Sequence, residues 1–158
     1  VKETILGFAG SSIEMLTVHL SGGEKMLDKA LLAAQTIDAK LIGVSLLTSL
    51  EESDSADLFN SSINNQIMRL FMVAKKINID GIVCSPLELD IANSVVGSSV
   101  LKITPGIREI SLNDDQARTM GAKEAIKKGA SFLVIGRPIT QAENISVALQ
   151  NLSSLINE

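Results

Sequence analysis

The chain has 158 residues, of which 46% are hydrophobic and 20% are charged, and its mean hydropathy is +0.30. These values are typical of a globular protein with a substantial core and exclude a disordered chain. A net charge of −4 disfavours a nucleic-acid surface. No apolar run reaches the roughly 18 residues of a membrane span, so we expect no membrane partner. The single cysteine excludes an internal disulfide and fits the reducing, cytoplasmic compartment.

Apolar runs typical of buried strands alternate with amphipathic stripes typical of helices. This alternation predicts an α/β fold in which a parallel sheet is covered by helices, with all of residues 1–158 in a single domain. The expected strands lie at 15–20, 41–47, 81–84, 100–104 and 131–135. The expected helices lie at 1–13, 24–37, 63–77, 86–96, 119–128 and 145–156.

Three details of these elements give sharper expectations. Gly7 and Gly10 weaken the first helix by up to about 1 kcal/mol each relative to alanine. Ser21 and Glu24 have the spacing of a capping box at the start of the second helix. The acidic, serine-rich stretch 51–57 is interpreted as a solvated loop.

Two consecutive strands are each followed by a glycine and an arginine. The fifth strand runs into Gly136 and Arg137, and the fourth is followed by Gly106 and Arg108. Glycine lets a ligand approach the backbone closely, and the planar guanidinium fork suits phosphate. For the Gly136 segment alone, a turn glycine beside a solvated arginine is the simpler interpretation. Two such segments together predict one anion site shared by neighbouring strand ends.

Other polar residues stand near strand ends. His19 closes the first strand and is interpreted as a hydrogen-bonded structural residue rather than a catalyst. Thr48 and Ser49 place two hydroxyls after the second strand. Cys84 is interpreted as a small buried side chain, since no neighbouring pattern marks it as a nucleophile. The segment 107–119 is long and polar for a connection that usually has about 2–6 residues, which is typical of functional or mobile loops.

Two α/β architectures fit this order of elements. A doubly wound sheet commonly carries a glycine fingerprint at a topological switch point, and neither is found. A (β/α)₈ TIM barrel binds phosphate in the loops after its last two strands, which matches the glycine and arginine placement. Because five strands cannot close such a barrel, we expect an open sheet corresponding to strands four to eight, with strands one to three absent from this sequence.

The motifs then match a known family. The chain resembles the carboxyl-terminal part of orotidine monophosphate decarboxylases of the bacterial branch. The matching segments occur in the family's order along the whole chain, and together they are specific. They are Val18-His19-Leu20-Ser21-Gly22-Gly23, Leu47-Thr48-Ser49, Gly81-Ile82-Val83-Cys84-Ser85-Pro86-Leu87-Glu88, Thr104-Pro105-Gly106-Ile107-Arg108, Asp115-Gln116-Ala117-Arg118 and Ile135-Gly136-Arg137-Pro138-Ile139-Thr140.

The resemblance implies a homodimeric lyase that converts orotidine monophosphate to uridine monophosphate (UMP) and carbon dioxide without metal or organic cofactor. It implies that Gly136 and Arg137 bind the substrate phosphate and that Gln116 bridges phosphate and pyrimidine. It places Arg108 in the substrate site and Thr48, with or without Ser49, at the base. The loop 107–119 would be a lid over the phosphate, so that binding energy from the remote phosphate supports catalysis.

One part of the family pattern is absent from this sequence. The family's Asp-x-Lys-x-x-Asp motif, whose lysine protonates the developing carbanion, has no match, so no catalytic residue is assigned. Asp38-Ala39-Lys40 has half of that spacing, but it precedes a strand instead of ending one and Gly43 replaces the second aspartate. Two alternatives stay open: a related phosphosugar enzyme, such as a hexulose phosphate synthase or ketogulonate phosphate decarboxylase, and a non-catalytic nucleotide-binding fragment.

Overall fold

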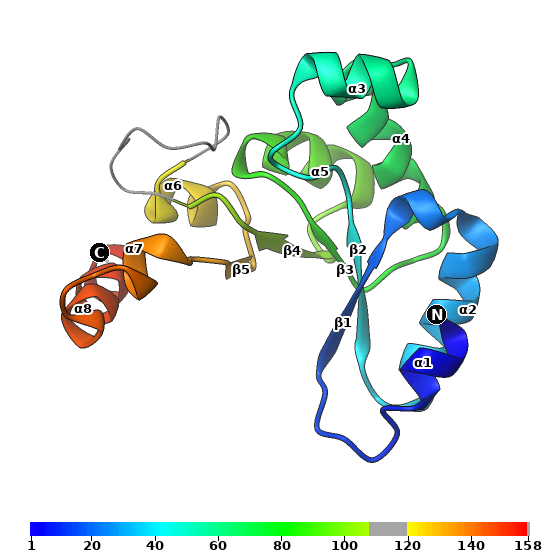
Figure 1. Ribbon diagram of the computed structural model, residues 1–158, viewed down its shortest axis with the longest axis horizontal. Helices are drawn as coiled ribbons and strands as arrows, with labels where there is room; N and C mark the ends of the chain where they lie inside the picture. Colours follow the sequence, from blue (N-terminus) through cyan, green and yellow to red (C-terminus); the bar gives the residue numbers. More distant parts are fainter. Residues whose placement is uncertain (108–119, 158) are drawn as a thin grey trace.

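A computed structural model describes residues 1–107 and 120–157 of the chain. Five parallel strands form one sheet in the order β1-β2-β3-β4-β5, so sequential strands are neighbours, and Figure 1 follows them across the molecule. Their bounds are Met15–His19 (β1), Lys40–Val44 (β2), Gly81–Val83 (β3), Leu101–Thr104 (β4) and Phe132–Leu133 (β5). In the described residues β1 and β5 do not pair with each other, so the sheet is open, as predicted.

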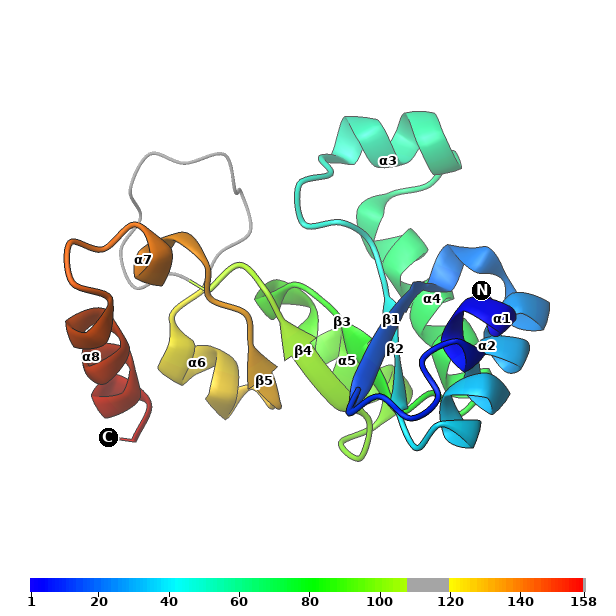
Figure 2. The same cartoon turned by 60° about the horizontal axis from the view of Figure 1, so that its bottom comes forward.

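Helices follow the strands, and the two termini lie at opposite ends of the molecule in both views (Figures 1 and 2). None of the helices within the described ranges has the length and apolarity that crossing a bilayer requires. The α-helices are Lys2–Leu6 (α1), Glu24–Thr36 (α2), Glu52–Phe59 (α3), Ile63–Lys76 (α4), Leu89–Val96 (α5), Ala122–Lys127 (α6), Arg137–Thr140 (α7) and Ile145–Asn157 (α8). Two 3₁₀ turns, Leu20–Gly22 (η1) and Pro86–Glu88 (η2), precede α2 and α5.

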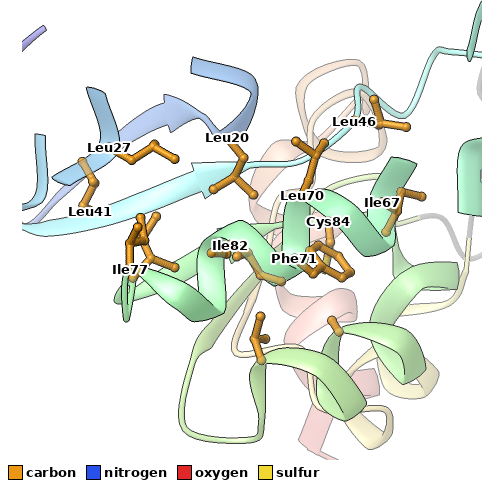
Figure 3. Packing of buried hydrophobic residues seen from close by; sticks show 14 of the residues in the cluster. Leu20, Leu27, Leu41, Leu46, Ile67, Leu70, Phe71, Ile77, Ile82 and Cys84 are labelled. Carbon is orange, nitrogen blue, oxygen red and sulfur yellow. The ribbon is translucent and has the colours of Figure 1, made fainter. Parts of the chain in front are cut away.

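The hydrophobic core lies between one face of the sheet and helices α2, α4 and α5. Alternate residues of each strand point to this face, because side chains in a strand alternate with a period of two. Figure 3 shows Ile67, Leu70 and Phe71 of α4 in the same cluster as Leu41 of β2 and Ile82 of β3, with Leu27 of α2 beside them. The opposite face is more open, and on it Phe132 and Val134 at the β5 edge are 47% and 51% exposed.

The acidic stretch interpreted as a loop is instead a helix. Residues 52–59 form α3, and the Glu51 carboxylate and the Asp54 side chain make a reciprocal capping box at its start. The Glu51 amide donates to Asp54 Oδ2 at 2.8 Å. Clustered carboxylates stabilise the amino-terminal end of a helix, where the free amide groups need acceptors. The charge run therefore caps a helix as well as facing solvent.

The end of the first helix and the cap of the second also differ from the predictions. The first helix was expected to span 1–13 but ends at Leu6, because Gly7 and then Gly10, at φ +82°, favour a turn over continued helix. The second helix begins at Glu24 with Gly23 as its amino-terminal cap, and no side chain caps it. The expected capping box of Ser21 and Glu24 is therefore not formed.

Gly81 of β3 is required by close packing within the sheet. A Cβ placed there would lie 2.7 Å from Ile42 Cδ1 and 3.1 Å from the backbone oxygen of Leu101. We expect Gly81→Ala to lower the free energy of unfolding by about 1–3 kcal/mol, because the Leu101 backbone cannot move aside. Urea titration followed by circular dichroism measures this loss, since the chain has no Trp or Tyr for fluorescence.

Gly136→Ala is the matched control for this substitution, because a Cβ at Gly136 would meet no atom of residues 1–107 or 120–157 within 4 Å. We expect its unfolding free energy to stay within about 0.5 kcal/mol of the parent chain. Equal losses in the two variants would show that crowding at Gly81 is not the cause.

Candidate functional site

The carboxyl ends of β4 and β5 lie side by side. Thr104 of β4 pairs with Leu133 of β5, and the Val134 amide donates to the Thr104 carbonyl at 2.9 Å. Both strands are parallel, so the residues that follow them emerge at the same edge of the sheet. This arrangement brings Gly106 and Gly136 to neighbouring strand ends.

The backbone around Gly136 is open on the side where a Cβ would stand. No atom of the described residues lies within 4 Å of that position. The Gly136 carbonyl accepts hydrogen bonds from the amides of Ile139 and Thr140, at 2.9 and 3.0 Å, which start the short helix α7. A ligand can therefore approach the Gly136 backbone without meeting a side chain on that residue.

Arg137 and Thr48 come from different strand ends. Arg137 is the first residue of α7, directly after Gly136, and is half-buried. Thr48 is also half-buried and lies in the turn that the Leu50 amide closes by donating to the Leu47 carbonyl at 3.1 Å. Since β2 and β5 are separated by β3 and β4, Thr48 belongs to another part of the same edge.

The remaining predicted site residues lie outside the described residues. These are Arg108, Gln116 and the lid assigned to 107–119, of which only Ile107 is described. The base of this segment is fixed on both sides, because Ile107 forms a parallel bridge with Met120 and the Met120 amide donates to the Gly106 carbonyl at 3.3 Å. Gly106 itself has φ +80°, a conformation that favours glycine. The described residues 107 and 120 therefore both lie beside the carboxyl end of β4.

A buried polar group lies on the helix-covered side of β3 and β4. The Lys102 side chain is 1% exposed, and its Nζ donates to the Gly97 carbonyl at 2.6 Å. Burial lowers the pKa of Lys102. The Glu88 carboxylate, also buried, accepts from the Ser85 amide at 3.1 Å and closes the η2 capping box. These side chains stabilise the backbone behind the strand ends instead of facing the open side.

Cys84 lies in this buried layer, as predicted. Burial is the main cause that raises the pKa of its thiol to about 12, the Glu88 carboxylate adds to the rise, and the Lys102 ammonium partly offsets it. The thiol is therefore protonated at neutral pH and cannot serve as a nucleophile. Within the described ranges, no three His, Cys, Asp or Glu side chains gather as metal ligands either.

The raised pKa of the Cys84 thiol predicts a loss of stability in alkali. Above its ordinary pKa of 9.0 the thiol ionises in the unfolded chain but stays protonated in the folded one, until about pH 12. The unfolded state then binds fewer protons, so the free energy of unfolding falls by about 1.4 kcal/mol between pH 8 and pH 10 through this group. The Cys84→Ala variant has no thiol to ionise. The difference in unfolding free energy between the parent chain and this variant should therefore be about 1.4 kcal/mol smaller at pH 10 than at pH 8. Urea titrations at each pH measure these free energies, and a difference between the two proteins that does not change with pH would contradict the prediction.

His19 differs from its interpretation as a hydrogen-bonded structural residue. It ends β1, its side chain is exposed, and no hydrogen bond joins its imidazole to another residue of the described ranges. It lines an open groove of about 590 Å³ that runs along the free edge of β1 beside α1. The signal that the sequence offered was its place as the last residue of a strand, at the edge where the site was expected.

Comparison with known proteins places this geometry in a family. The model of the family described as "Orotidine 5'-phosphate decarboxylase / HUMPS family" matches residues 1–152. The chain belongs to this family. The decarboxylase of Wolbachia pipientis subsp. Culex pipiens is 44% identical over 145 residues, which are 91% of this chain and 64% of that protein. The decarboxylase of Wigglesworthia glossinidia brevipalpis is 40% identical, over 99% of this chain and 69% of that protein.

The chain thus spans about two thirds of the length of these orotidine 5′-phosphate decarboxylase relatives. Among solved structures, orotidine 5′-phosphate decarboxylase from Lactobacillus acidophilus has a TM-score of 0.83 and 28% identity, over 99% of this chain and 69% of that one. The enzyme from Pyrococcus horikoshii OT3 has a TM-score of 0.72 at 21% identity, which shows the shared fold. The five strands and their helices therefore form part of a (β/α)₈ barrel, as predicted.

Proposed function

We propose that this protein is an orotidine 5′-phosphate decarboxylase of pyrimidine biosynthesis, acting on orotidine monophosphate to give UMP and carbon dioxide. The observation that supports the proposal is the adjacent placement of the β4 and β5 carboxyl ends, which Gly106 and Gly136 follow in the sequence. The loops after the last two strands are where barrels of this kind hold phosphate. The curated relatives that carry this name support the same substrate.

In this proposal the phosphate binds at the β4 and β5 ends, where the Gly136 backbone is open and Arg137 follows it. The guanidinium of Arg137 donates charge-assisted hydrogen bonds to the phosphate oxygens. Arg108 and Gln116 complete the substrate contacts, and Thr48 contacts the pyrimidine from the β2 end. The proton that replaces the lost carboxylate would come from the family's Asp-x-Lys-x-x-Asp motif, which these 158 residues do not contain. The residues of this chain therefore bind and orient the nucleotide.

We also propose that the protein works as a cytoplasmic homodimer and needs no cofactor. The single cysteine supports a reducing compartment. The dimer is proposed from the family resemblance, because in that family a charged network reaches across two subunits. Analytical ultracentrifugation of the full chain tests the dimer directly.

Calorimetric titration with three ligands tests the proposed substrate. We expect UMP to bind, uridine to bind at least about 30-fold more weakly because it lacks the phosphate, and glucose 6-phosphate to bind more weakly than UMP. Tighter binding of the sugar phosphate than of UMP would instead support the phosphosugar alternative. Equal binding of uridine and UMP would contradict a phosphate site.

A further inference from the structure

A single row of side chains crosses the open face of the sheet just below the strand ends. Strand pairing aligns His19 with Val44, Val44 with Val83, Val83 with Ile103, and Ile103 with Phe132. Residues that are paired in adjacent strands point to the same face of a sheet. Four of these five side chains are apolar, and His19 is the one polar member.

The two ends of this row, His19 and Phe132, are exposed and the three residues between them are half-buried, whereas Ile42 and Gly81 in the next row down are buried. Ile42 is 1% exposed, and its Cδ1 reaches to within 2.7 Å of where a Gly81 Cβ would stand. The Ile42 side chain thus covers Gly81 and closes the sheet face between β2 and β3 at that level. A ligand held at the strand ends therefore meets the row of His19, Val44, Val83, Ile103 and Phe132, which we call the upper row.

The two ends of the upper row differ in chemistry. At the β5 end stand Gly136 and Arg137, which suit a phosphate. At the β1 end stands His19, which is exposed and lines the α1–β1 groove, and whose imidazole forms no hydrogen bond with another described residue. Thr48 follows the adjacent strand, β2. Between the ends, the row offers apolar surface that suits the flat face of a heterocycle.

We propose that His19 recognises the pyrimidine end of the bound nucleotide, hydrogen-bonding to a polar group on the ring or its ribose; this proposal rests on the proposed function. With the phosphate fixed at the β4 and β5 ends, the nucleotide extends across the upper row towards β1 and β2. An imidazole can donate or accept a hydrogen bond, and pyrimidine carbonyls and ribose hydroxyls supply the partners. His19 therefore distinguishes a nucleotide from a bare phosphate.

The test uses the fact that His19 is the single histidine of the chain, so its ring signals in proton NMR need no assignment. We expect its Hε1 and Hδ2 resonances to shift when UMP is added and to stay in place when inorganic phosphate is added. A role confined to stabilising the fold would not make the shift depend on the pyrimidine nucleoside.

Variants complete the test by calorimetry. We expect His19→Ala to bind UMP about tenfold more weakly and inorganic phosphate unchanged, and His19→Gln, which keeps a donor and an acceptor, to recover most of the loss. Thr17→Val is the matched control, because Thr17 is exposed on the same face of β1 but lies one row below His19, beside the buried Ile42. It should bind UMP as the parent chain does.

The outcomes separate this inference from the proposed function. UMP binding that neither moves the His19 resonances nor weakens in His19→Ala would overturn the role of His19 and leave the proposed function standing. No UMP binding by the parent chain would overturn the proposed function, and the role of His19 with it.

Discussion

Replacing Arg137 with alanine is expected to weaken UMP binding by about 2–3 kcal/mol, or roughly 30- to 150-fold, because charge-assisted hydrogen bonds to the phosphate are lost. Arg137 directly follows Gly136 at the end of the barrel segment where β4 and β5 meet. Arg137→Lys keeps the charge but not the planar fork, so we expect a smaller loss. Isothermal titration calorimetry with UMP measures each change.

Arg69→Ala is the matched control for Arg137→Ala. It removes the same charge from an exposed position on α4, a helix that packs on the covered face of the sheet. We expect it to leave UMP affinity within about twofold of the parent chain, because exposed charges far from the ligand are screened by salt. If both substitutions weaken binding equally, net charge rather than a phosphate contact is responsible. Uridine, which lacks the phosphate, should bind equally to the parent chain and to Arg137→Ala.

Replacing Phe71 with alanine is expected to lower the free energy of unfolding by about 3–5 kcal/mol. Phe71 is fully buried on α4, in the cluster that joins this helix to β2 and β3 (Figure 3). The loss combines the missing apolar contacts with the cavity left behind, and it is a large part of a typical domain stability of about 5–15 kcal/mol. Urea titration followed by circular dichroism gives the value.

Met72→Ala is the control for this core substitution, because Met72 is the next residue of the same helix but is 59% exposed. We expect it to change stability by less than about 0.5 kcal/mol. Alanine favours a helix more than either Phe or Met does, so a similar loss in both variants would show that burial of Phe71 does not set the cost. Such a result would contradict the placement of α4 on the sheet.

The sequence was informative where hydrophobic periodicity dominates local structure. The stripe over 63–77 became α4, and the apolar strand runs at 41–47 and 81–84 became the buried strands β2 and β3. Periodicity works here because burying one face of each element decides its structure. The Gly106 and Gly136 segments were also placed correctly at neighbouring strand ends, since parallel strands present their carboxyl ends at one edge.

Prediction failed where tertiary contacts or local polar bonds decide the structure. The acidic 51–57 stretch has no apolar stripe, yet Ser55 within α3 is buried and its Oγ donates to the Ser61 carbonyl at 2.9 Å. The sequence could not show whether the His19 side chain forms hydrogen bonds, because that depends on which elements pack beside the edge strand β1. The strand β5 is only two residues long, shorter than its apolar run indicates.

The central claim is that the carboxyl ends of β4 and β5 together hold the phosphate of a nucleotide. Titration of the ¹⁵N-labelled protein tests it most directly, because the amide signals of Gly106 and Gly136 report on each strand end separately. We predict that UMP and inorganic phosphate both shift these two amides more than those of the exposed helix α3. Binding of UMP that leaves both glycine amides unchanged would contradict the claim.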